Sequence, residues 1–256
     1  MLSIIIPAHN EENRIGPTLE EYGKFFSKKD LNESFEILVV LNACKDDTMG
    51  IVKKYAKKFR IVKYIEFKEG GKGFAVLEGF KQAIKKGSSI MGFVDADMAT
   101  KPEDFYDLYK NIGNADTIIA SRWVKGAKAD RTFKKYIRSR GFNLLVRILF
   151  LVPYRDTQCG AKIFRMEVID KIIGEVNITR WAFDVNLLYL IRKKGFKIKE
   201  YPTIWTDKEG SKIVSNKIPI QMAAGIVRLR FLYSPLRDFI RLYDKMPEWI
   251  KFHHIK

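Results

Sequence analysis

The fold is decided by the stretch Ile90-Met-Gly-Phe-Val-Asp-Ala-Asp97, in which an apolar run ends in two aspartates. A short apolar run bounded by polar residues is typical of a strand that is buried on both faces of a sheet. Side chains alternate along an extended chain, so the sequence predicts that both carboxylates point the same way. Such a pair suits a hard divalent cation, Mg²⁺ or Mn²⁺, that also holds a diphosphate. A pair of helix-capping aspartates in a turn is the alternative.

Short runs rich in Ile and Val recur on both sides of this stretch, and segments of helical length separate them. The runs are Leu2–Pro7, Phe35–Leu41, Ile61–Phe67 and Thr117–Ala120, and the helical segments are Glu11–Lys29, Asp46–Phe59, Gly73–Lys86 and Pro102–Asn111. The order Thr100-Lys-Pro-Glu103 predicts a capping box with proline in the first turn of the last helix. This alternation predicts an α/β fold with a mostly parallel sheet, its strands buried on both faces and covered by helices.

Ligands of such sheets bind beyond the carboxyl ends of the strands, so polar residues that follow a strand are the first candidates. Asn10 and Glu11 follow the first strand and Asn42 follows the second, in positions that suit a nucleotide base or ribose, or a helix cap. The loop Gly70-Gly-Lys-Gly73 follows the third strand and can bring backbone N–H groups and a lysine to a phosphate. No hydroxyl residue follows that lysine, so it is not a P-loop, and a plain turn is the alternative. Together these strand ends predict a nucleotide diphosphate ligand.

The charge of the chain predicts an anionic partner. Its 256 residues suit one large domain with or without an appendage, and 47 basic against 30 acidic residues give a net charge of +17. Nucleic acid, anionic lipid and a phosphorylated substrate all fit that charge. A nucleic-acid-binding protein would need a recognisable module or aromatic residues among the basic ones, and the sequence has neither. Cys44 and Cys159 lack metal-ligand spacing, which favours two free thiols in a reducing cytosol.

The middle of the chain is the most basic part. Residues 122–155 carry ten basic side chains and one acid, Asp130: the basic residues are Arg122, Lys125, Lys128, Arg131, Lys134, Lys135, Arg138, Arg140, Arg147 and Arg155. A helix-like segment, Ala182–Lys194, and a strand-like segment, Phe196–Trp205, follow.

The tail from Asn216 onward is amphipathic. An apolar face at helical spacing is formed by Ile220, Ala223, Ala224, Val227 and Phe231, and arginines crowd the remainder. A core-packing helix with a solvated basic face is one interpretation, and an interfacial membrane helix is the favoured one. The sequence shows no signal peptide and no run of the ~20 apolar residues that a spanning helix needs. We therefore expect a catalytic domain at 1–214 and a membrane-interface helical segment at 215–256, in a peripheral membrane protein on the cytoplasmic face.

From Ser3 to Lys212 the chain resembles the family 2 glycosyltransferases, which have the GT-A fold. Within that family it is most similar to the dolichyl-phosphate glucosyltransferases, with the polyprenyl-phosphate mannose synthases as cousins. The motifs that carry the resemblance are Ile5–Glu11, Gly70–Gly73, Asp95–Thr100, Ser121-Arg122, Asp156-Thr-Gln-Cys-Gly160, Arg180-Trp-Ala-Phe-Asp184, Trp205 and Gly210-Ser-Lys212. Asp156–Gly160 and the Trp-Ala-Phe-Asp motif are specific to the branch that uses lipid phosphates, and Asp95–Thr100 is similar to the glucosyl subgroup.

The resemblance implies a site for the nucleotide-sugar. Its pocket would be lined by Pro7, Asn10, Glu11 and Asn42, with Lys72 near the base or diphosphate, Asp95 and Asp97 at the ribose and the metal, and Ser211 and Lys212 on a loop that closes over the diphosphate. Asp97 would be the main metal ligand. Many relatives have an aspartate pair where Leu41-Asn42 stands here, and this leaves the base open, because an amide both donates and accepts. The eukaryotic glucosyl enzymes also have an N-terminal membrane helix that we do not find here.

The resemblance also implies the acceptor site and the reaction. Arg122 and Arg138 would clamp the acceptor phosphate, with Asp156 and Gln158 beside them. A hexose, with glucose favoured, would pass from UDP-glucose to a polyprenyl or dolichyl phosphate at an anionic membrane surface, with inversion, in protein glycosylation. A phosphate monoester is largely dianionic at neutral pH, so Asp184 would act as a base or only orient the sugar or Arg122. The alternatives are a mannosyltransferase that uses GDP-mannose and a family 2 enzyme with a soluble acceptor.

Overall fold

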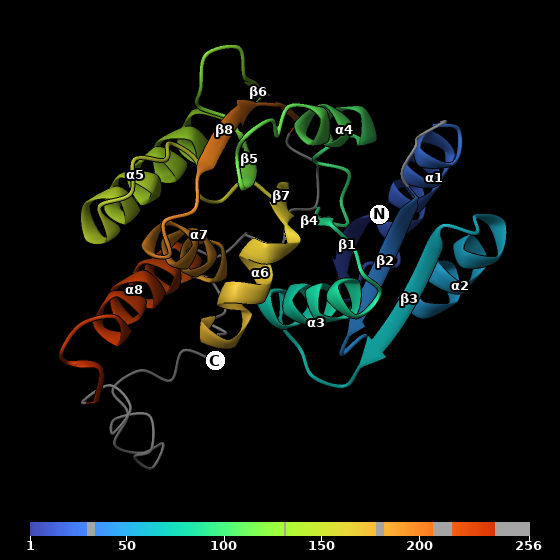
Figure 1. Ribbon diagram of the computed structural model, residues 1–256, viewed down its shortest axis with the longest axis horizontal. Coiled ribbons are helices and arrows are strands. Elements are labelled where there is room, and N and C mark those ends of the chain that lie inside the picture. The colour runs from blue at the N-terminus through green and yellow to red at the C-terminus, as the bar shows by residue number, and fades with distance from the viewer. Residues whose placement is uncertain (30–33, 131, 178–181, 207–216, 239–256) are drawn as a thin grey trace.

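The computed structural model describes residues 1–29, 34–130, 132–177, 182–206 and 217–238. They form a layered α/β structure with one seven-stranded sheet through the middle and helices on both of its faces (Figure 1). The strand order is β3-β2-β1-β4-β7-β5-β8, and a separate pair of strands, β6 and β9, lies beside the sheet. The expected α/β class is confirmed.

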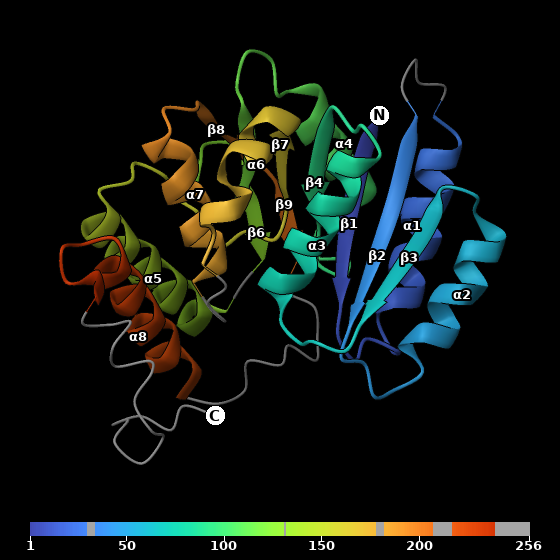
Figure 2. The ribbon, with the colours of Figure 1, turned by 60° about the horizontal axis from the view of Figure 1, so that its bottom comes forward.

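The first half of the chain alternates strands and helices as its sequence predicts. The strands are β1 (Leu2–Ala8), β2 (Phe35–Asn42), β3 (Val62–Phe67) and β4 (Ile90–Phe93), and the helices are α1 (Ile15–Ser27), α2 (Thr48–Lys58), α3 (Lys72–Lys85) and α4 (Pro102–Lys110). All pairs among these strands are parallel, with Ile4 opposite Ile37 on the central pair. Their carboxyl ends therefore meet at one edge of the sheet, toward the bottom of Figure 2.

The second half completes the sheet with one reversed strand. Its strands are β5 (Thr117–Ser121), β6 (Lys128–Asp130), β7 (Lys162–Arg165), β8 (Ile198–Pro202) and β9 (Ile204–Thr206), and its helices are α5 (Phe133–Phe150), α6 (Met166–Ile172), the 3₁₀ turn η1 (Ile173–Glu175), α7 (Phe183–Lys193) and α8 (Lys217–Leu232). β7 is antiparallel to both of its neighbours, β4 and β5. The sheet is thus mostly parallel, with one strand that runs the other way.

Alternation along the central strands divides the core into two layers. On β1, Ile4 packs with side chains of α1, α2 and α4, whereas Ile5 packs with side chains of α3, α6 and α7 on the opposite face. A third cluster joins α5, α7 and α8 through residues such as Val146 and Ile226. Helices α5 and α8 lie side by side at the outer end of the molecule (Figures 1 and 2).

Three local expectations were wrong. β3 is not buried on both faces, because it is the edge strand and exposes Lys63 and Tyr64. Phe196–Trp205 is not one strand: it breaks at Thr203, so that β8 joins the main sheet and β9 pairs with β6. Thr100 does not form a capping box, because Lys101 caps α4 without a side-chain bond. Pro102 does open the helix as predicted.

The part of the amphipathic tail that the structure describes forms α8. Ile226 and Leu229 are buried, whereas Val227 and Phe231, from the expected apolar face, are both 39% exposed. Within the described ranges, no helix is both long and apolar enough to cross a membrane.

Candidate active site

The loops at the carboxyl ends of β1, β2 and β4 share an unusual backbone conformation. Asn10, Ala43 and Met98 have φ angles of 53°, 50° and 58°, in the left-handed region that residues other than glycine rarely adopt. Backbone strain of this kind costs about 1–3 kcal/mol per residue and tends to gather where a ligand binds. The three loops therefore point to one functional edge of the sheet.

Asn42, at the end of β2, joins the end of β1 to the loop after β3. Its side chain is buried, and its Nδ2 donates to the carbonyl of Ala8 at 2.9 Å while its Oδ1 accepts the backbone N–H of Gly71 at 3.0 Å. The carbonyl of Asn42 also lies 2.7 Å from Nδ1 of His9. The amide thus binds backbone on both of its sides, so what the structure shows for Asn42 is loop positioning. A contact with the nucleotide stays a prediction.

Asn10 and Glu11 join the loop after β1 to the loop after β2. Oδ1 of Asn10 accepts the backbone N–H of Lys45 at 2.7 Å, and the backbone N–H of Glu11 donates to Oγ1 of Thr48 at 2.8 Å. Pro7 is buried inside β1. The structure therefore brings the predicted nucleotide residues Pro7, Asn10, Glu11 and Asn42 together at this edge.

Asp95 and Asp97 lie at the same edge, directly beyond β4. Nζ of Lys72 is 2.6 Å from Oδ1 of Asp95, and Oδ1 of Asp97 accepts the backbone N–H of Ala99 at 3.0 Å. Burial and then the negative charge of Asp95 raise the pKa of Asp97 above its usual value. The charge of Asp95 thus disfavours the ionised form of Asp97. Asp97 lies in a turn after β4, and that both carboxylates point the same way stays a prediction.

Two side chains of α1 hold the loop that carries Asp95 and Asp97. Oγ1 of Thr18 donates to the carbonyl of Ala96 at 2.8 Å, and the hydroxyl of Tyr22 donates to the carbonyl of Thr100 at 3.0 Å. Both donors are fully buried. The backbone around the carboxylates is thus fixed before any ligand arrives.

The pair fits a divalent cation that is shared with a ligand. Within the described ranges, no group of three or more His, Cys, Asp or Glu side chains could hold an ion alone. Two carboxylates with further oxygens from a phosphate and from water are a usual Mg²⁺ arrangement. A cation would also relieve the repulsion that raises the pKa of Asp97.

Lys72 is the first residue of α3, next to the Gly-rich turn. Burial alone would lower its pKa, but Asp95, Asp184 and Asp97 together raise it above the usual value, so the side chain stays positive. The glycine that follows has a steric role: a Cβ on Gly73 would lie 2.7 Å from the ring of Phe183. Gly73 therefore lets the start of α3 approach α7, which carries Asp184.

Lys162 is a functional candidate that the sequence analysis missed. It is fully buried on β7, and its Nζ donates to Oδ1 of Asp184 and to the carbonyl of Cys159, both at 2.7 Å. Burial alone would raise the pKa of Asp184, but the charges of Lys162 and Lys72 lower it. Asp184 is therefore held as a carboxylate. A lysine within the apolar run Ala161–Phe164 was the signal that could have revealed the pair.

Arg122 and Asp156 form a second buried ion pair. Nε and Nη2 of Arg122 donate to the two carboxylate oxygens at 2.7 and 2.8 Å, and the backbone N–H of Arg122 donates to Oδ2 at 3.0 Å. The rings of Trp123 and Trp205 lie 5.7 and 5.3 Å from the guanidinium carbon. Burial would raise the pKa of Asp156, but Arg122 lowers it. Nη1 is the guanidinium nitrogen that does not face Asp156.

The loop Asp156–Gly160 connects this ion pair to the carboxylates. A Cβ on Gly160 would lie 2.0 Å from Oδ2 of Asp95, so the loop passes directly against the predicted metal ligand. Asn143 and Glu200, which the sequence analysis also missed, hold the loop. Oδ1 of Asn143 accepts the backbone N–H of Thr157 at 2.9 Å, and Glu200 accepts the backbone N–H groups of Arg155 and Asp156.

The remaining predicted site residues are Gln158, Arg138, Ser211 and Lys212. Gln158 lies within the Asp156–Gly160 loop, and its backbone N–H donates to Oδ1 of Asp156 at 3.3 Å. Arg138 is exposed on α5, and among the described residues it makes no hydrogen bond or ion pair with Arg122 or Asp156. Its role as a clamp stays a prediction. Ser211 and Lys212 lie outside the described residues.

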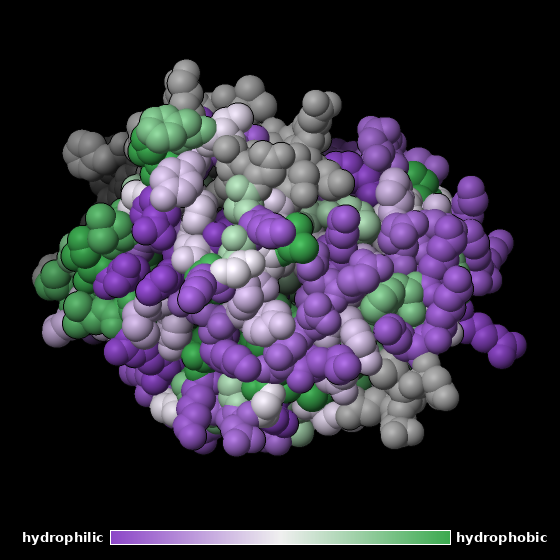
Figure 3. Space-filling model, turned by 90° about the horizontal axis from the view of Figure 1, so that it is seen from above, coloured by the Kyte–Doolittle hydropathy of each residue, from purple (hydrophilic) through white to green (hydrophobic). Residues whose placement is uncertain are grey.

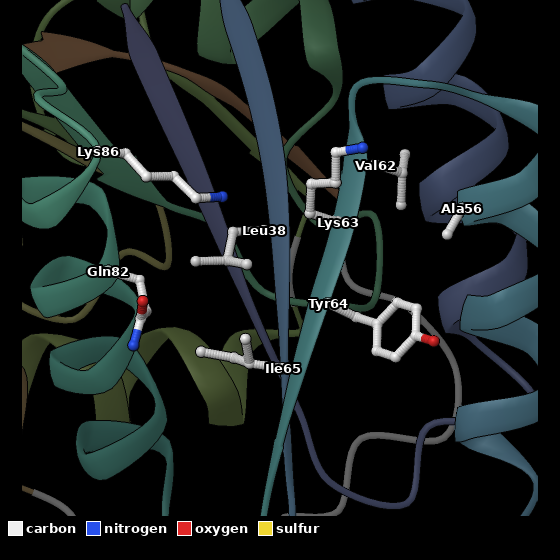
Figure 4. A pocket seen from close by; sticks show the side chains of 8 residues that line it. All are labelled: Leu38, Ala56, Val62, Lys63, Tyr64, Ile65, Gln82 and Lys86. Atoms are coloured by element: carbon white, nitrogen blue, oxygen red, sulfur yellow. The ribbon is translucent and has the colours of Figure 1, made fainter.

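A hollow of about 370 Å³ on the outer edge of the sheet is a different place (Figure 4). It lies against β3, between side chains of α2 and α3 such as Ala56 and Gln82. Its two charged side chains are lysines, and one of them, Lys86, is paired with Glu36. It lacks the carboxylates that the predicted chemistry needs.

The chain is similar in sequence to known proteins. The chain matches the family model described as Glycosyl transferase family 2 over residues 3–173. It is 36% identical over 250 residues to the dolichyl-phosphate beta-glucosyltransferase of Dictyostelium discoideum, covering 91% of this chain and 74% of the relative. The dolichyl-phosphate beta-glucosyltransferase of Homo sapiens is 32% identical over 255 residues, covering 92% and 77%.

Solved structures share the fold at low sequence identity. The chain is similar to glucosyl-3-phosphoglycerate synthase from Mycobacterium tuberculosis in complex with UDP, with a TM-score of 0.67, 13% identity and coverage of 90% and 79%. It is also similar to the mannosyltransferase PcManGT from Pyrobaculum calidifontis in complex with GDP-Man and Mn²⁺, with a TM-score of 0.61, 16% identity and coverage of 94% and 69%. The expected GT-A fold is confirmed.

Proposed function

Because this chain belongs to glycosyl transferase family 2, we propose that it transfers glucose from UDP-glucose to a polyprenyl or dolichyl phosphate. The names of the relatives from Dictyostelium discoideum and Homo sapiens support glucose and a lipid phosphate. The observation that carries the proposal is the Asp156–Gly160 loop. One end of it binds the buried guanidinium of Arg122, and the other end lies against Asp95. The proposed phosphate-acceptor site and the proposed nucleotide-donor site would thus share one short segment.

The donor half of the site consists of Lys72, Asp95 and Asp97. The two carboxylates would hold Mg²⁺ or Mn²⁺, which when bound stabilises the charge of a leaving diphosphate as a Lewis acid. Solved structures of similar fold contain Mn²⁺ with UDP or with GDP-Man, which supports this assignment. Lys72 adds a positive charge from the protein itself, at the first turn of α3.

The acceptor half of the site must hold the acceptor phosphate next to the diphosphate of the donor, although both are anions. The phosphate oxygen of the acceptor attacks the anomeric carbon, the bond from that carbon to the diphosphate breaks, and the nucleoside diphosphate leaves. Arg122 offsets the repulsion between the two anions, and its position is fixed by Asp156 and the two indole rings. Arg138 and Gln158 would complete the acceptor site.

Asp184 orients groups in this mechanism and does not act as the base. An acceptor phosphate with a second pKa near ~6 is mostly dianionic at neutral pH, so it has no proton that must be removed. The lowered pKa of Asp184 makes it a weak base, and Lys162 occupies its Oδ1. The carboxylate is therefore available to position the sugar or Lys72.

The reaction would take place at the cytoplasmic face of an anionic membrane, with the chain bound peripherally. A polyprenyl chain stays in the bilayer, so the enzyme must come to it. Exposed Val227 and Phe231 on α8, with Arg230 on the same helix, support a membrane role for the segment 215–256.

A comparison of three acceptors tests the proposal. We expect the protein with UDP-glucose to glucosylate a polyprenyl phosphate and to leave the matching polyprenol and 3-phosphoglycerate unchanged. The polyprenol tests the need for the phosphate, and 3-phosphoglycerate tests the need for the lipid. Equal transfer to 3-phosphoglycerate would show a soluble acceptor and would overturn the lipid assignment.

A further inference from the structure

Helix α5 exposes an apolar stripe, interrupted by Arg140 and Gly141, that no described element covers. The stripe consists of Phe133, Ile137, Leu144 and Ile148, followed by Leu151 at the end of the helix. The intervals of four, seven, four and three positions place all five on one helical face. Their exposed fractions run from 53% for Ile137 to 75% for Phe133 and Leu151. Leu151 adopts a φ of 51°, an unusual backbone conformation for leucine that leaves its side chain in solvent.

The opposite face of α5 already supplies the core contacts of this helix. Val146 and Phe150 are buried and pack with Ile226 and Leu229 of α8. The stripe is therefore a second apolar face on a helix that is already packed. Exposed apolar surface on this scale usually marks an interaction site. Figure 3 shows hydrophobic surface at the left of the molecule, the side that carries α5 in Figure 1.

Arginines border the stripe. A hollow of about 390 Å³ runs along α5, and its lining combines the guanidinium groups of Arg140, Arg147 and Arg155 with the apolar side chains of Ile137 and Leu144. The sequence of α5 contains five basic residues and no acidic residue. Glu200 lies near the hollow, but its carboxylate accepts the backbone N–H groups of Arg155 and Asp156. The surface thus offers cations next to exposed apolar side chains.

We propose that this α5 surface, the apolar stripe together with Arg140, Arg147 and Arg155, docks on an anionic phospholipid bilayer. Phosphate headgroups would lie in the arginine-lined hollow, and the stripe would enter the boundary between headgroups and acyl chains. The inference rests on the proposed function, since it names the surface that brings the site to its lipid acceptor. A second copy of this chain fits less well, because a two-fold contact through α5 would bring arginines of like charge together.

The α5 surface is connected directly to the acceptor half of the site. Trp123, next to Arg122 in sequence, packs edge-on against Tyr136 with the ring centres 5.3 Å apart, and Arg140 lies 5.6 Å above the same indole. Asn143, which lines the hollow, also binds Thr157 of the Asp156–Gly160 loop. A bilayer in contact with α5 would therefore present a lipid phosphate next to Arg122.

Vesicle binding by the full chain tests the inference. The apolar variant Ile137→Gln/Leu144→Gln/Ile148→Gln is expected to bind mixed phosphatidylcholine–phosphatidylglycerol vesicles at least about tenfold more weakly than wild type. Arg147→Gln/Arg155→Gln is expected to lose the preference for these vesicles over pure phosphatidylcholine. The matched controls are Tyr64→Gln on the edge strand and Lys53→Gln/Lys54→Gln on α2, which change exposed residues far from α5 in the fold. Both controls should bind as wild type does.

Two results would overturn the docking assignment. In one, both α5 variants bind vesicles as wild type does. In the other, light scattering shows a wild-type dimer that the apolar variant dissociates without any change in vesicle binding, which would assign the stripe to a second copy.

A vesicle-free assay separates this inference from the proposed function. With UDP-glucose and a short, water-soluble prenyl phosphate, both α5 variants are expected to transfer glucose at the wild-type rate. Failure of wild type itself with this acceptor and with a long-chain one would remove the proposed function, whatever the vesicles show. Loss of transfer in the α5 variants alone would place α5 in the acceptor site and would contradict a role limited to docking.

Discussion

Asp97 can be tested as a metal ligand, and burial and the negative charge of Asp95 both raise its pKa. Asp97→Asn keeps an oxygen for the backbone N–H of Ala99 but removes the charge that a cation needs. We expect glucose transfer to fall by about 10²-fold or more. We also expect Mn²⁺ with UDP to raise the melting temperature of wild type but not that of the variant. The measurements are a transfer assay and a thermal melt.

Asp107→Asn is the matched control for this substitution, because Asp107 is exposed on α4, away from the site. It should leave both measurements unchanged. Full transfer activity in Asp97→Asn would remove this residue from the metal site.

Lys162 and Asp184 allow a test of the buried ion pair. Lys162→Met leaves Asp184 charged and buried without its partner, which costs about 3–5 kcal/mol for pairs of this kind. Lys81→Met breaks the solvent-exposed pair with Glu78 and should cost at most about 1 kcal/mol. Urea unfolding of both variants measures the difference. Equal costs would mean that the Lys162–Asp184 pair is not buried in solution.

The pH dependence of stability should follow from the lowered pKa values of Asp156 and Asp184. A carboxyl whose pKa is lower in the folded state stabilises the fold above its unfolded pKa, about 3.9. That stabilisation is lost as the pH falls through the folded-state pKa. The free energy of unfolding of wild type should therefore decrease steeply below about pH 4. The gap between wild type and Asp184→Asn should be widest near neutral pH and should narrow in acid, and a constant gap would contradict the assignment.

The sequence predicted which residue types gather at the strand ends, but not how they pair. Pro7, Asn10, Asn42, Lys72, Asp95 and Asp97 were found because each follows or ends an apolar run. Lys162 and Asn143 were missed, since their partners are 22 and 14 positions away and only the folded chain brings them together. The same limit explains why the sequence did not reveal that the amide of Asn42 binds the backbone of Ala8 and Gly71.

The Asp156–Gly160 loop can be tested as an element through its last residue. Gly160→Ala would place a methyl group 2.0 Å from Oδ2 of Asp95, so either the loop or the carboxylate must move. We expect transfer to fall by about 10²-fold, since a displacement near 1 Å at a reacting centre costs that much. Gly174→Ala is the control, because its methyl group would meet nothing within 4 Å. A fully active Gly160→Ala protein would show that Asp95 tolerates displacement.

Elements were predictable where local pattern decides them. β1, β2 and β4 are short, apolar and bounded by polar residues, and their bounds match the expected ones closely. β7 lies between β4 and β5 and runs antiparallel to both, and no local sequence pattern reveals this pairing. The break at Thr203 was missed for the same reason, since the partner of β9 is β6, far away in sequence.

At the scale of the whole molecule, the net charge of +17 predicts that membrane binding depends on salt. Raising the ionic strength from about 0.05 M to about 0.5 M shortens the Debye length severalfold, so binding to anionic vesicles should weaken markedly. Transfer to a short water-soluble acceptor should change much less, because the charged groups of the active site are buried or in close contact with one another. Vesicle sedimentation and a transfer assay at matched salt measure the two effects. Binding that does not depend on salt would contradict an electrostatic contribution.

The net charge of the chain predicted an anionic partner but not the surface that meets it. The sequence analysis placed the interface in the segment 215–256, whereas the structure points to α5 as well. In α5, Val146 and Ile148 are both apolar and two positions apart, yet one is buried and the other is 63% exposed. Only the packing of α8 against α5 decides which face is core.

The most direct test of the central claim is the transfer of labelled sugar into a lipid product. UDP-glucose and GDP-mannose would be compared as donors to a polyprenyl phosphate, with Mg²⁺ or Mn²⁺ and with Asp97→Asn as the inactive reference. We predict that labelled glucose enters the organic phase from UDP-glucose, and that this transfer is lost in the variant. Labelled lipid from GDP-mannose instead would correct the sugar and the base. No labelled lipid from either donor, with the nucleotide-sugar still bound, would contradict the account.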